Sequence, residues 1–320
     1  MLQYSVQRLA LFVPTLLLVS VLVFILMRIV PGDPALLILI GTEDGSGTYT
    51  QEELDKVRHE IGTDRPLVVQ YGSWIWGLAR GDLGQSVWDG TPVVDELKKR
   101  LPVTLELAVL SMIIATVIAI PLGVISAVKQ DTWIDYAVKV YTVLGVAAPT
   151  FWIGILTIMA LAFWFNWLPP LDYADLWEDP LKNLQQLIFP AIALAFFNMA
   201  FIARVTRSSM LEVLREDYIR TARSKGLAER VVIIRHALKN AFLPVITVSG
   251  WQFGRLIAGT VIIESIFLVP GMGRLLILSV IHRDFTMVQA ITMIVTVMVL
   301  MTNLLVDTLY AWLDPRIRYT

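Results

Sequence analysis

Six long stretches of mostly apolar residues recur along the chain, and this recurrence limits the fold more than any other feature. They are Leu9–Val30, Val103–Val128, Val138–Trp164, Ile188–Ala203, Phe242–Ile262 and Met287–Tyr310. A helix crosses the hydrocarbon of a bilayer with about 20 such residues. The chain is 56% hydrophobic and 17% charged, whereas soluble domains are about one-quarter charged. The sequence therefore predicts an all-α polytopic membrane protein with about six transmembrane helices.

The first apolar stretch has a second interpretation, which is a cleaved signal peptide. It is longer than such a segment, and no small-residue cleavage site follows it. We therefore favour a transmembrane helix. The chain then divides into the N-terminal helix (1–30), an insert between helices 1 and 2 (31–102) and a core of five helices (103–320).

The insert has the composition of a folded segment and not of a linker. Thr50 and Glu53 form the pattern of a capping box, which predicts the start of a helix. Trp74 and Trp76 suit either the lipid interface or internal packing, and we favour packing.

Basic residues in the loops predict the orientation, because cytoplasmic loops are enriched in lysine and arginine. The loop between the fourth and fifth stretches (204–239) holds nine of them. The loop between the third and fourth (166–187) holds only Lys182, against four acidic residues. We therefore expect the first loop and both termini in the cytoplasm and the insert outside. The basic run 98–100, at the outer edge of the second stretch, departs from this rule.

Residues for catalysis or metal binding are scarce. The chain has no cysteine and three histidines, His59, His236 and His282, which lie far apart in charged segments. It has no Walker A loop for ATP, since "GMGRLL" after Pro270 lacks the lysine. No catalytic constellation stands out either. We expect no enzyme activity, no metal site, no cofactor bound by this chain and no nucleic acid partner.

The stretch 218–244, "YIRTARSKGLAERVVIIRHALKNAFLP", interrupts the apolar pattern. Helix-forming residues lead to Gly226, which is suited to end a helix in a left-handed turn, and a second helix follows. This order predicts a rigid knob of two short helices beneath the membrane. Ala222 at its centre, with Arg220, Arg223 and Lys225 around it, suits insertion into an acidic groove of another protein. The alternative is a loop that only follows the positive-inside rule.

The same stretch resembles the cytoplasmic "EAA" loop of the permease subunits of bacterial ABC importers, which attaches to the ATPase. "RTARSKG" (220–226) and "FLP" (242–244) resemble the dipeptide, oligopeptide and nickel branch. Arg220 and Thr221 replace the usual glutamate and first alanine, as is typical of that branch. Six further stretches resemble it in order along nearly the whole chain: "MRIVPGDP", "LPVTLELA", "AAPTFWIGIL", "VIIESIFLVPGMGRL", "HRDFTMVQA" and "LYAWLDPRIRY".

The resemblance implies a type I ABC importer permease fold in the cytoplasmic (inner) membrane of a bacterium or archaeon. The implied partners are membrane lipid, a second homologous permease, two ATPases that bind ATP and Mg, and an extracytoplasmic solute-binding protein. The implied substrates are dipeptides or oligopeptides, or similar solutes such as nickel chelates, glutathione and oligosaccharides. The residues implied in ATPase docking are Arg220, Thr221, Ala222, Arg223, Lys225, Gly226, Leu227, Leu243 and Pro244.

Polar residues within the apolar stretches are the candidates for a translocation pathway, because such groups are costly in lipid. Gln252 and Arg255 lie three residues apart, so we expect them on one helical face. Asn198 and Glu264 complete the candidate set. Hydrogen bonds between helices are the alternative role for each of them.

Two other functions compete with the permease interpretation. An ion-coupled secondary transporter needs titratable residues at mid-membrane, and the centres of the apolar stretches offer Arg255 but no acidic residue. A membrane-embedded enzyme needs a catalytic set, which we do not find.

Overall fold

The computed structural model describes residues 2–29, 32–41, 49–170 and 172–313, and these residues form helices and short connections. An isolated bridge joins Gln85 and Pro92, and no strand occurs in the described part of the chain. The α-helices are α1 (Leu2–Ile29), α2 (Pro34–Gly41), α3 (Gln51–Glu60), α4 (Leu67–Ala79), α5 (Val93–Val128), α6 (Trp133–Ala147), α7 (Thr150–Phe165), α8 (Pro180–Val213), α9 (Asp217–Ser224), α10 (Glu229–Val231), α11 (Lys239–Ile266), α12 (Met272–Ile281) and α13 (Phe285–Leu313). A π-helix, Val232–Leu238, joins α10 to α11. The all-α prediction is confirmed.

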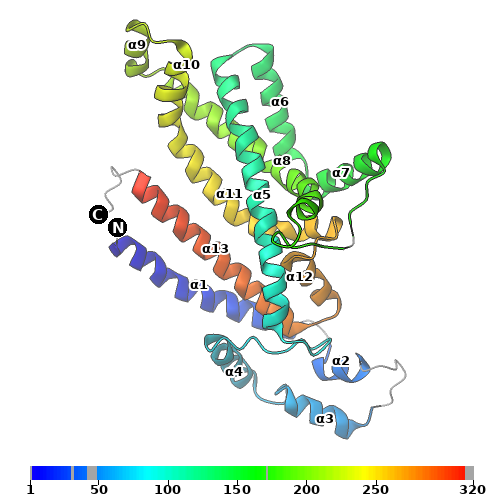
Figure 1. The fold of residues 1–320 in the computed structure, drawn as a ribbon. Helices are drawn as coiled ribbons and strands as arrows, with labels where there is room; N and C mark the ends of the chain where they lie inside the picture. The colour runs from blue at the N-terminus through cyan, green and yellow to red at the C-terminus, as the bar shows by residue number, and fades with distance from the viewer. Residues whose placement is uncertain (1, 30–31, 42–48, 171, 314–320) are drawn as a thin grey trace.

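The long helices form an elongated bundle with α8 inside it (Figure 1). α8 packs against α5, α6, α7 and α11, and α13 packs against α1 and α11. Side chains such as Leu107, Leu194 and Ile263 are buried where α5, α8 and α11 meet. By contrast, α1 exposes most of its leucine and isoleucine side chains, as a helix that faces lipid does.

The third predicted span, Val138–Trp164, consists of two helices that meet at a sharp bend. α6 and α7 are bent by 107° at a short break. Ala148 has an extended backbone and Pro149 follows it, because proline disfavours the helical conformation of the residue before it. Among the described residues, five helices are long and apolar enough to cross a membrane, or six when this bent pair counts as one span.

The other predicted spans are confirmed as helices, but with different ends. The second begins at Val93, ten residues before the predicted start, so residues 93–102 of the predicted insert belong to a core helix. The outer basic residues Lys98, Lys99 and Arg100 lie in this extension and form ion pairs with Asp95 and Glu96 one turn away. The fourth and fifth helices likewise extend past their apolar centres.

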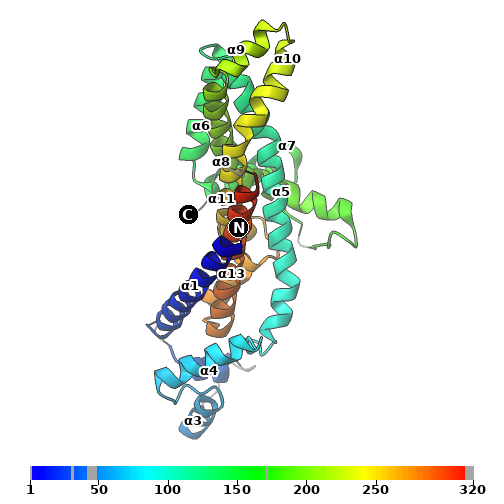
Figure 2. The ribbon, with the colours of Figure 1, turned by 90° about the vertical axis from the view of Figure 1, so that its left-hand side faces the viewer.

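The insert lies at one end of the molecule, and α9 and α10 lie at the other (Figures 1 and 2). The predicted capping box at Thr50 is confirmed, since its side chain and that of Glu53 each accept the other's backbone N–H. The insert is tied to the core at Asp284, a buried residue whose carboxylate accepts hydrogen bonds from the Ser86 hydroxyl at 2.5 Å and the Val87 backbone N–H at 3.2 Å. The predicted basic C-terminal segment (314–320) lies outside the described residues.

Candidate coupling elbow and translocation surface

Residues 217–238, which we call the elbow, join α8 to α11 at the end of the molecule opposite the insert (Figure 1). α9 ends at Ser224, and Gly226 two residues later has a φ of 74°, the left-handed conformation that glycine adopts without strain. The Leu227 backbone N–H then donates to the Ala222 carbonyl at 3.4 Å, as in a glycine-terminated helix end. The predicted helix–glycine–helix unit is therefore confirmed.

The elbow has a hydrophobic core of its own. Ile219 and Ala222 of α9 pack against Val232 and Ala237 of the π-helix and against Met210 of α8. Ala222 is 7% exposed, so it lies inside the elbow and not on its surface. A larger side chain at this position would disturb the packing of α9 before it affected any partner.

Polar contacts tie α9 to the segments that follow it. The Arg223 guanidinium donates to both carboxylate oxygens of Glu229, at 2.7 and 3.2 Å, and these hydrogen bonds raise the pKa of Arg223. The Asn240 amide donates to the Tyr218 hydroxyl at 2.7 Å. The elbow is therefore held across its glycine turn and against the first turn of α11.

The remaining residues of the predicted docking set divide by exposure. Arg220, Thr221, Lys225, Gly226 and Leu227 are exposed; Arg220 has a 3.4 Å contact with Asp217, one turn away. Leu243 is half-buried and Pro244 is exposed, both in α11.

Three exposed residues of the elbow were not among the predicted docking residues: Tyr218, Val231 and Ile234. Together with Leu227 they add exposed apolar side chains to an elbow whose exposed charged residues are mostly basic. The signal was available, since apolar residues occur on all sides of the segment 231–238. Apolar contact area rimmed by charge is typical of protein interfaces.

A buried carboxylate secures the helix from which the elbow extends. Asp135 of α6 is fully buried and accepts two hydrogen bonds from the Arg207 guanidinium of α8, at 2.7 and 2.9 Å. It also contacts the Lys139 ammonium at 2.8 Å, the Ser126 hydroxyl at 2.6 Å and the Asp131 backbone N–H at 3.1 Å. This cluster, which we call the Asp135 clamp, joins α5, α6 and α8 six residues before α8 ends.

Glu264, a predicted pathway residue, lies in a buried polar cluster near the insert end of α11. Its carboxylate accepts the Thr104 hydroxyl at 2.8 Å and the Arg274 backbone N–H at 3.0 Å. A Cβ at Gly271 or Gly273 would collide with this carboxylate or with the α11 backbone. Glu264 therefore positions the first turn of α12 and is fully buried.

The other predicted pathway residues do not come together on one surface. Gln252 is 3% exposed and Asn198 is also buried, with its amide bonded to the Leu194 carbonyl of its own helix. Arg255 is exposed. The expectation that Gln252 and Arg255 share a face is wrong, because residues three apart still differ by about 60° around a helix, and the edge of the bundle falls between them.

Arg255 belongs to an exposed stripe along the middle of α11. The other members are Trp251, Ala258, Gly259 and Ile262. The glycines of α11 differ in their surroundings: Gly250 and Gly254 approach α13, whereas a Cβ at Gly259 would meet no atom within 4 Å. The stripe therefore has the positively charged side chain of Arg255 and a glycine with no neighbouring atoms packed against it, both near the centre of a spanning helix.

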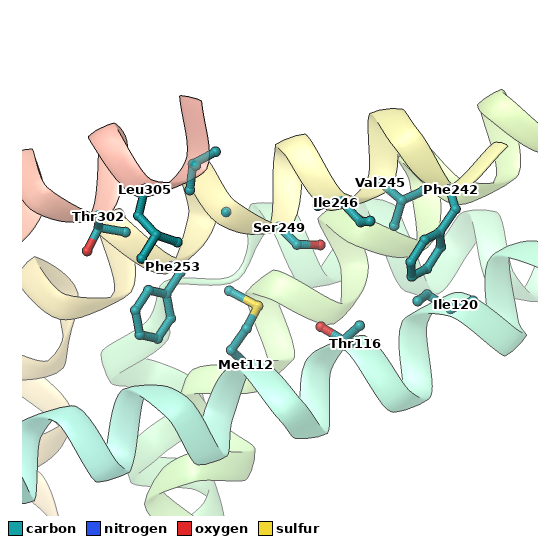
Figure 3. A pocket seen from close by; sticks show the side chains of 12 residues that line it. Met112, Thr116, Ile120, Phe242, Val245, Ile246, Ser249, Phe253, Thr302 and Leu305 are labelled. Atoms are coloured by element: carbon teal, nitrogen blue, oxygen red, sulfur yellow. The ribbon is translucent and has the colours of Figure 1, made fainter. Parts of the chain in front are cut away.

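A separate cavity of about 300 Å³ lies between α5, α11 and α13. Met112 and Thr116 of α5 and Phe242 and Phe253 of α11 point toward one another across it (Figure 3). None of the four predicted pathway residues lines this cavity, and its walls are apolar except for a few hydroxyl groups.

The bundle, the elbow and the insert together define a polytopic transport subunit, and comparisons with known proteins give its family. Residues 119–319 match the family described as "Binding-protein-dependent transport system inner membrane component". Residues 1–108 match the corresponding N-terminal membrane-component family. The chain belongs to the binding-protein-dependent ABC importer permeases, in the dipeptide and oligopeptide branch, and the resemblance that the sequence motifs indicated is confirmed.

Curated relatives cover almost the whole chain. A peptide transport system permease of Brucella abortus is 43% identical over 313 residues, which are 98% of each chain. The dipeptide transport system permease protein DppB of Escherichia coli K12 is 41% identical over 342 aligned positions, covering 100% of this chain and 99% of its own. The family and these relatives are components of transport systems and not enzymes.

A solved structure, an amino acid ABC transporter with histidines, has a similar fold. The TM-score is 0.54 at 18% identity, over 68% of this chain and 94% of that one. At this identity the likeness concerns the fold alone. Together, the family and the apolar helices identify a multi-pass inner-membrane protein.

Proposed function

We propose that this chain is the transmembrane permease subunit of an ATP-driven importer of dipeptides or oligopeptides. The peptide permeases that match it along nearly their whole length support this substrate class. The observation that carries the coupling role is the elbow: a rigid unit at one end of the bundle with exposed basic and apolar side chains. In this proposal an ATPase subunit binds that surface. When the ATPase moves on binding ATP, the elbow transmits the movement to α8 and α11.

The assembly contains a second permease of the same family, two ATPases and an extracytoplasmic solute-binding protein. Both termini and the elbow lie in the cytoplasm, and the insert lies outside near the binding protein. The nine basic residues of 204–239 support this orientation. During transport, the membrane-spanning helices of the two permeases expose the pathway alternately to the outside and to the cytoplasm. ATP and Mg are bound by the ATPases, since this chain has no Walker A loop.

Co-purification with the neighbouring transporter subunits tests this function. The tagged permease is expected to retain an ATPase in mild detergent and to import radiolabelled dipeptide into proteoliposomes only with ATP and the binding protein. An ATPase-free chain that imports peptide in response to a proton or sodium gradient would instead establish the ion-coupled transporter.

The exposed stripe of α11 is the part of the chain that we place on the translocation pathway. Arg255 lies 11 residues from the end of a 28-residue helix, so its charge is near the membrane centre. A lipid-facing arginine there costs about 3 kcal/mol, and the described residues offer its guanidinium no ion-pair partner. A water-filled passage between the two permeases would hydrate this charge.

Arg255→Leu is therefore expected to reduce ATP-dependent dipeptide uptake about tenfold or more while the assembly remains intact, because the passage loses a hydrated cation. Arg255→Lys keeps the charge and is expected to retain more uptake. Uptake in proteoliposomes and subunit recovery after purification measure the two effects. If Arg255 faced only lipid, leucine would favour membrane insertion and leave uptake unchanged, which would remove the stripe from the pathway.

A further inference from the structure

Helix α4 of the insert exposes apolar side chains where a helix in water exposes charge. Val68 is 82% exposed, and Leu67, Val69 and Trp76 are also exposed. No charged residue occurs between Arg65 and Arg80. On a helix, Val68, Val69 and Trp76 fall on the side away from Gln70 and Trp74, so the exposed side of α4 is its apolar side.

The neighbouring helix α3 gives an internal comparison. It belongs to the same insert, yet its sequence "QEELDKVRHE" is charged around most of its surface. Leu54 is its one buried residue. Because the two helices differ so strongly in composition, their surroundings differ too: α3 has the surface of a helix in water, and α4 does not.

Contacts with α1 place α4 at the level of the membrane. The Tyr71 hydroxyl lies 2.8 Å from the Ser20 hydroxyl, and the Tyr71 and Trp74 rings pack on Phe24. Arg28 donates to the Gln70 side chain at 2.5 Å. Since Ser20 is nine residues before the end of α1, these contacts begin about 13 Å inside that end at 1.5 Å per residue.

α4 therefore packs against the last three turns of α1, and it runs crosswise to the bundle at the lower end of the molecule (Figures 1 and 2). The surface of α1 at this level is apolar and exposed, with Leu18, Leu22 and Leu26. Both helices therefore expose apolar side chains at the end of the molecule where they touch. At 13 residues α4 is too short to cross the bilayer.

We propose that α4 lies in the interface of the outer leaflet, with its exposed apolar side in contact with lipid. Val68, Val69 and Trp76 would occupy the boundary between headgroups and acyl chains. The Arg80 guanidinium lies 4.6 Å from the Trp76 ring centre, an aromatic and cation pair suited to the headgroup level. Membrane lipid is thus the partner of this surface, and α4 anchors the insert beside α1.

Spin labels at single cysteines test this directly, because the chain has no native cysteine. The complete transporter is placed in phosphatidylglycerol and phosphatidylethanolamine nanodiscs with a label at Val68→Cys. Leu22→Cys on α1 is the lipid reference, and Glu52→Cys on α3 is the water reference. Oxygen partitions into lipid and a nickel chelate into water, so we expect the label at position 68 to have the high oxygen-to-nickel accessibility ratio of position 22.

The proposal would be overturned if the oxygen-to-nickel accessibility ratio at position 68 equalled that of Glu52→Cys, both with and without the binding protein. Nickel accessibility that disappears only when the solute-binding protein is added would also overturn it and would make α4 a protein contact. A second label at Val69→Cys repeats the measurement on the same side of the helix. Val68 and Leu22 are more than half exposed, Val69 is 48% exposed and Glu52 is exposed on α3, so the substitutions remove little packing.

Discussion

Replacing Leu227 by glutamate is expected to reduce ATP-dependent uptake at least tenfold and to lower the recovery of the ATPase with the permease. Leu227 follows the glycine turn and is exposed among the apolar side chains of the elbow. In the docked assembly the carboxylate at position 227 would lose its water without gaining a hydrogen-bond partner on the ATPase. This costs about 2 kcal/mol or more. About 1.4 kcal/mol is a factor of ten in affinity. Proteoliposome uptake and ATPase co-purification measure the two effects.

The substitution tests docking more than folding, because Leu227 is exposed and its hydrogen bond to α9 comes from its backbone N–H. Val128→Glu is the matched control: it adds the same charge at an exposed apolar position on the same end of the molecule, at the last residue of α5. We expect Val128→Glu to retain uptake. If both variants retained uptake and the ATPase, the elbow would not be the attachment site.

The outline of the elbow was predictable because a glycine turn between two helices is a local signal. The sequence indicated that Gly226 ends a helix, and its positive φ confirms this. Which side chains face outward was not predictable. Ala222 is buried and Arg223 is paired with Glu229, since both depend on how α9 folds back onto the following segment.

The ends of the spanning helices were predicted less well than their centres. Apolar composition marks only the part of a helix that lies in hydrocarbon, whereas α5 continues through ten further residues stabilised by ion pairs one turn apart. At Pro149 the opposite occurred. By composition α6 and α7 form one apolar stretch, whereas the extended backbone at Ala148 before Pro149 divides it into two helices.

The Asp135 clamp was invisible in the sequence because its two main partners are 72 residues apart. Arg207 falls in the basic loop predicted after the fourth apolar stretch, and Asp135 falls between the second and third stretches among charges of both signs. Only the packing of α6 against α8 brings them together. The same limit explains the wrong prediction for Gln252 and Arg255. Their spacing in the sequence does not indicate which of them faces the interior of the bundle and which faces outward.

Asp135→Ala is expected to be the most destabilising single substitution discussed for this chain. It removes the acceptor for Arg207, Lys139 and Ser126 at once and leaves a guanidinium unpaired at a mostly buried position. Loss of one partner of a buried ion pair costs about 3–5 kcal/mol, and the partial exposure of Lys139 reduces this to about 2–3 kcal/mol. The apparent Tm in detergent should fall by about 5 °C or more, as measured by the fluorescence of the purified protein.

Asp131→Asn is the matched control, four residues before Asp135 in the connection between α5 and α6. Its side chain is exposed, 3.9 Å from Lys139, and its backbone bond to Asp135 is retained. Its positive φ of 61° suits asparagine, so we expect a Tm change within about 1 °C, as for most surface substitutions. Combining Asp135→Leu with Arg207→Met removes both charges and should recover part of the lost stability. A double variant as unstable as Asp135→Ala would mean that shape, and not the ion pair, holds α6 against α8.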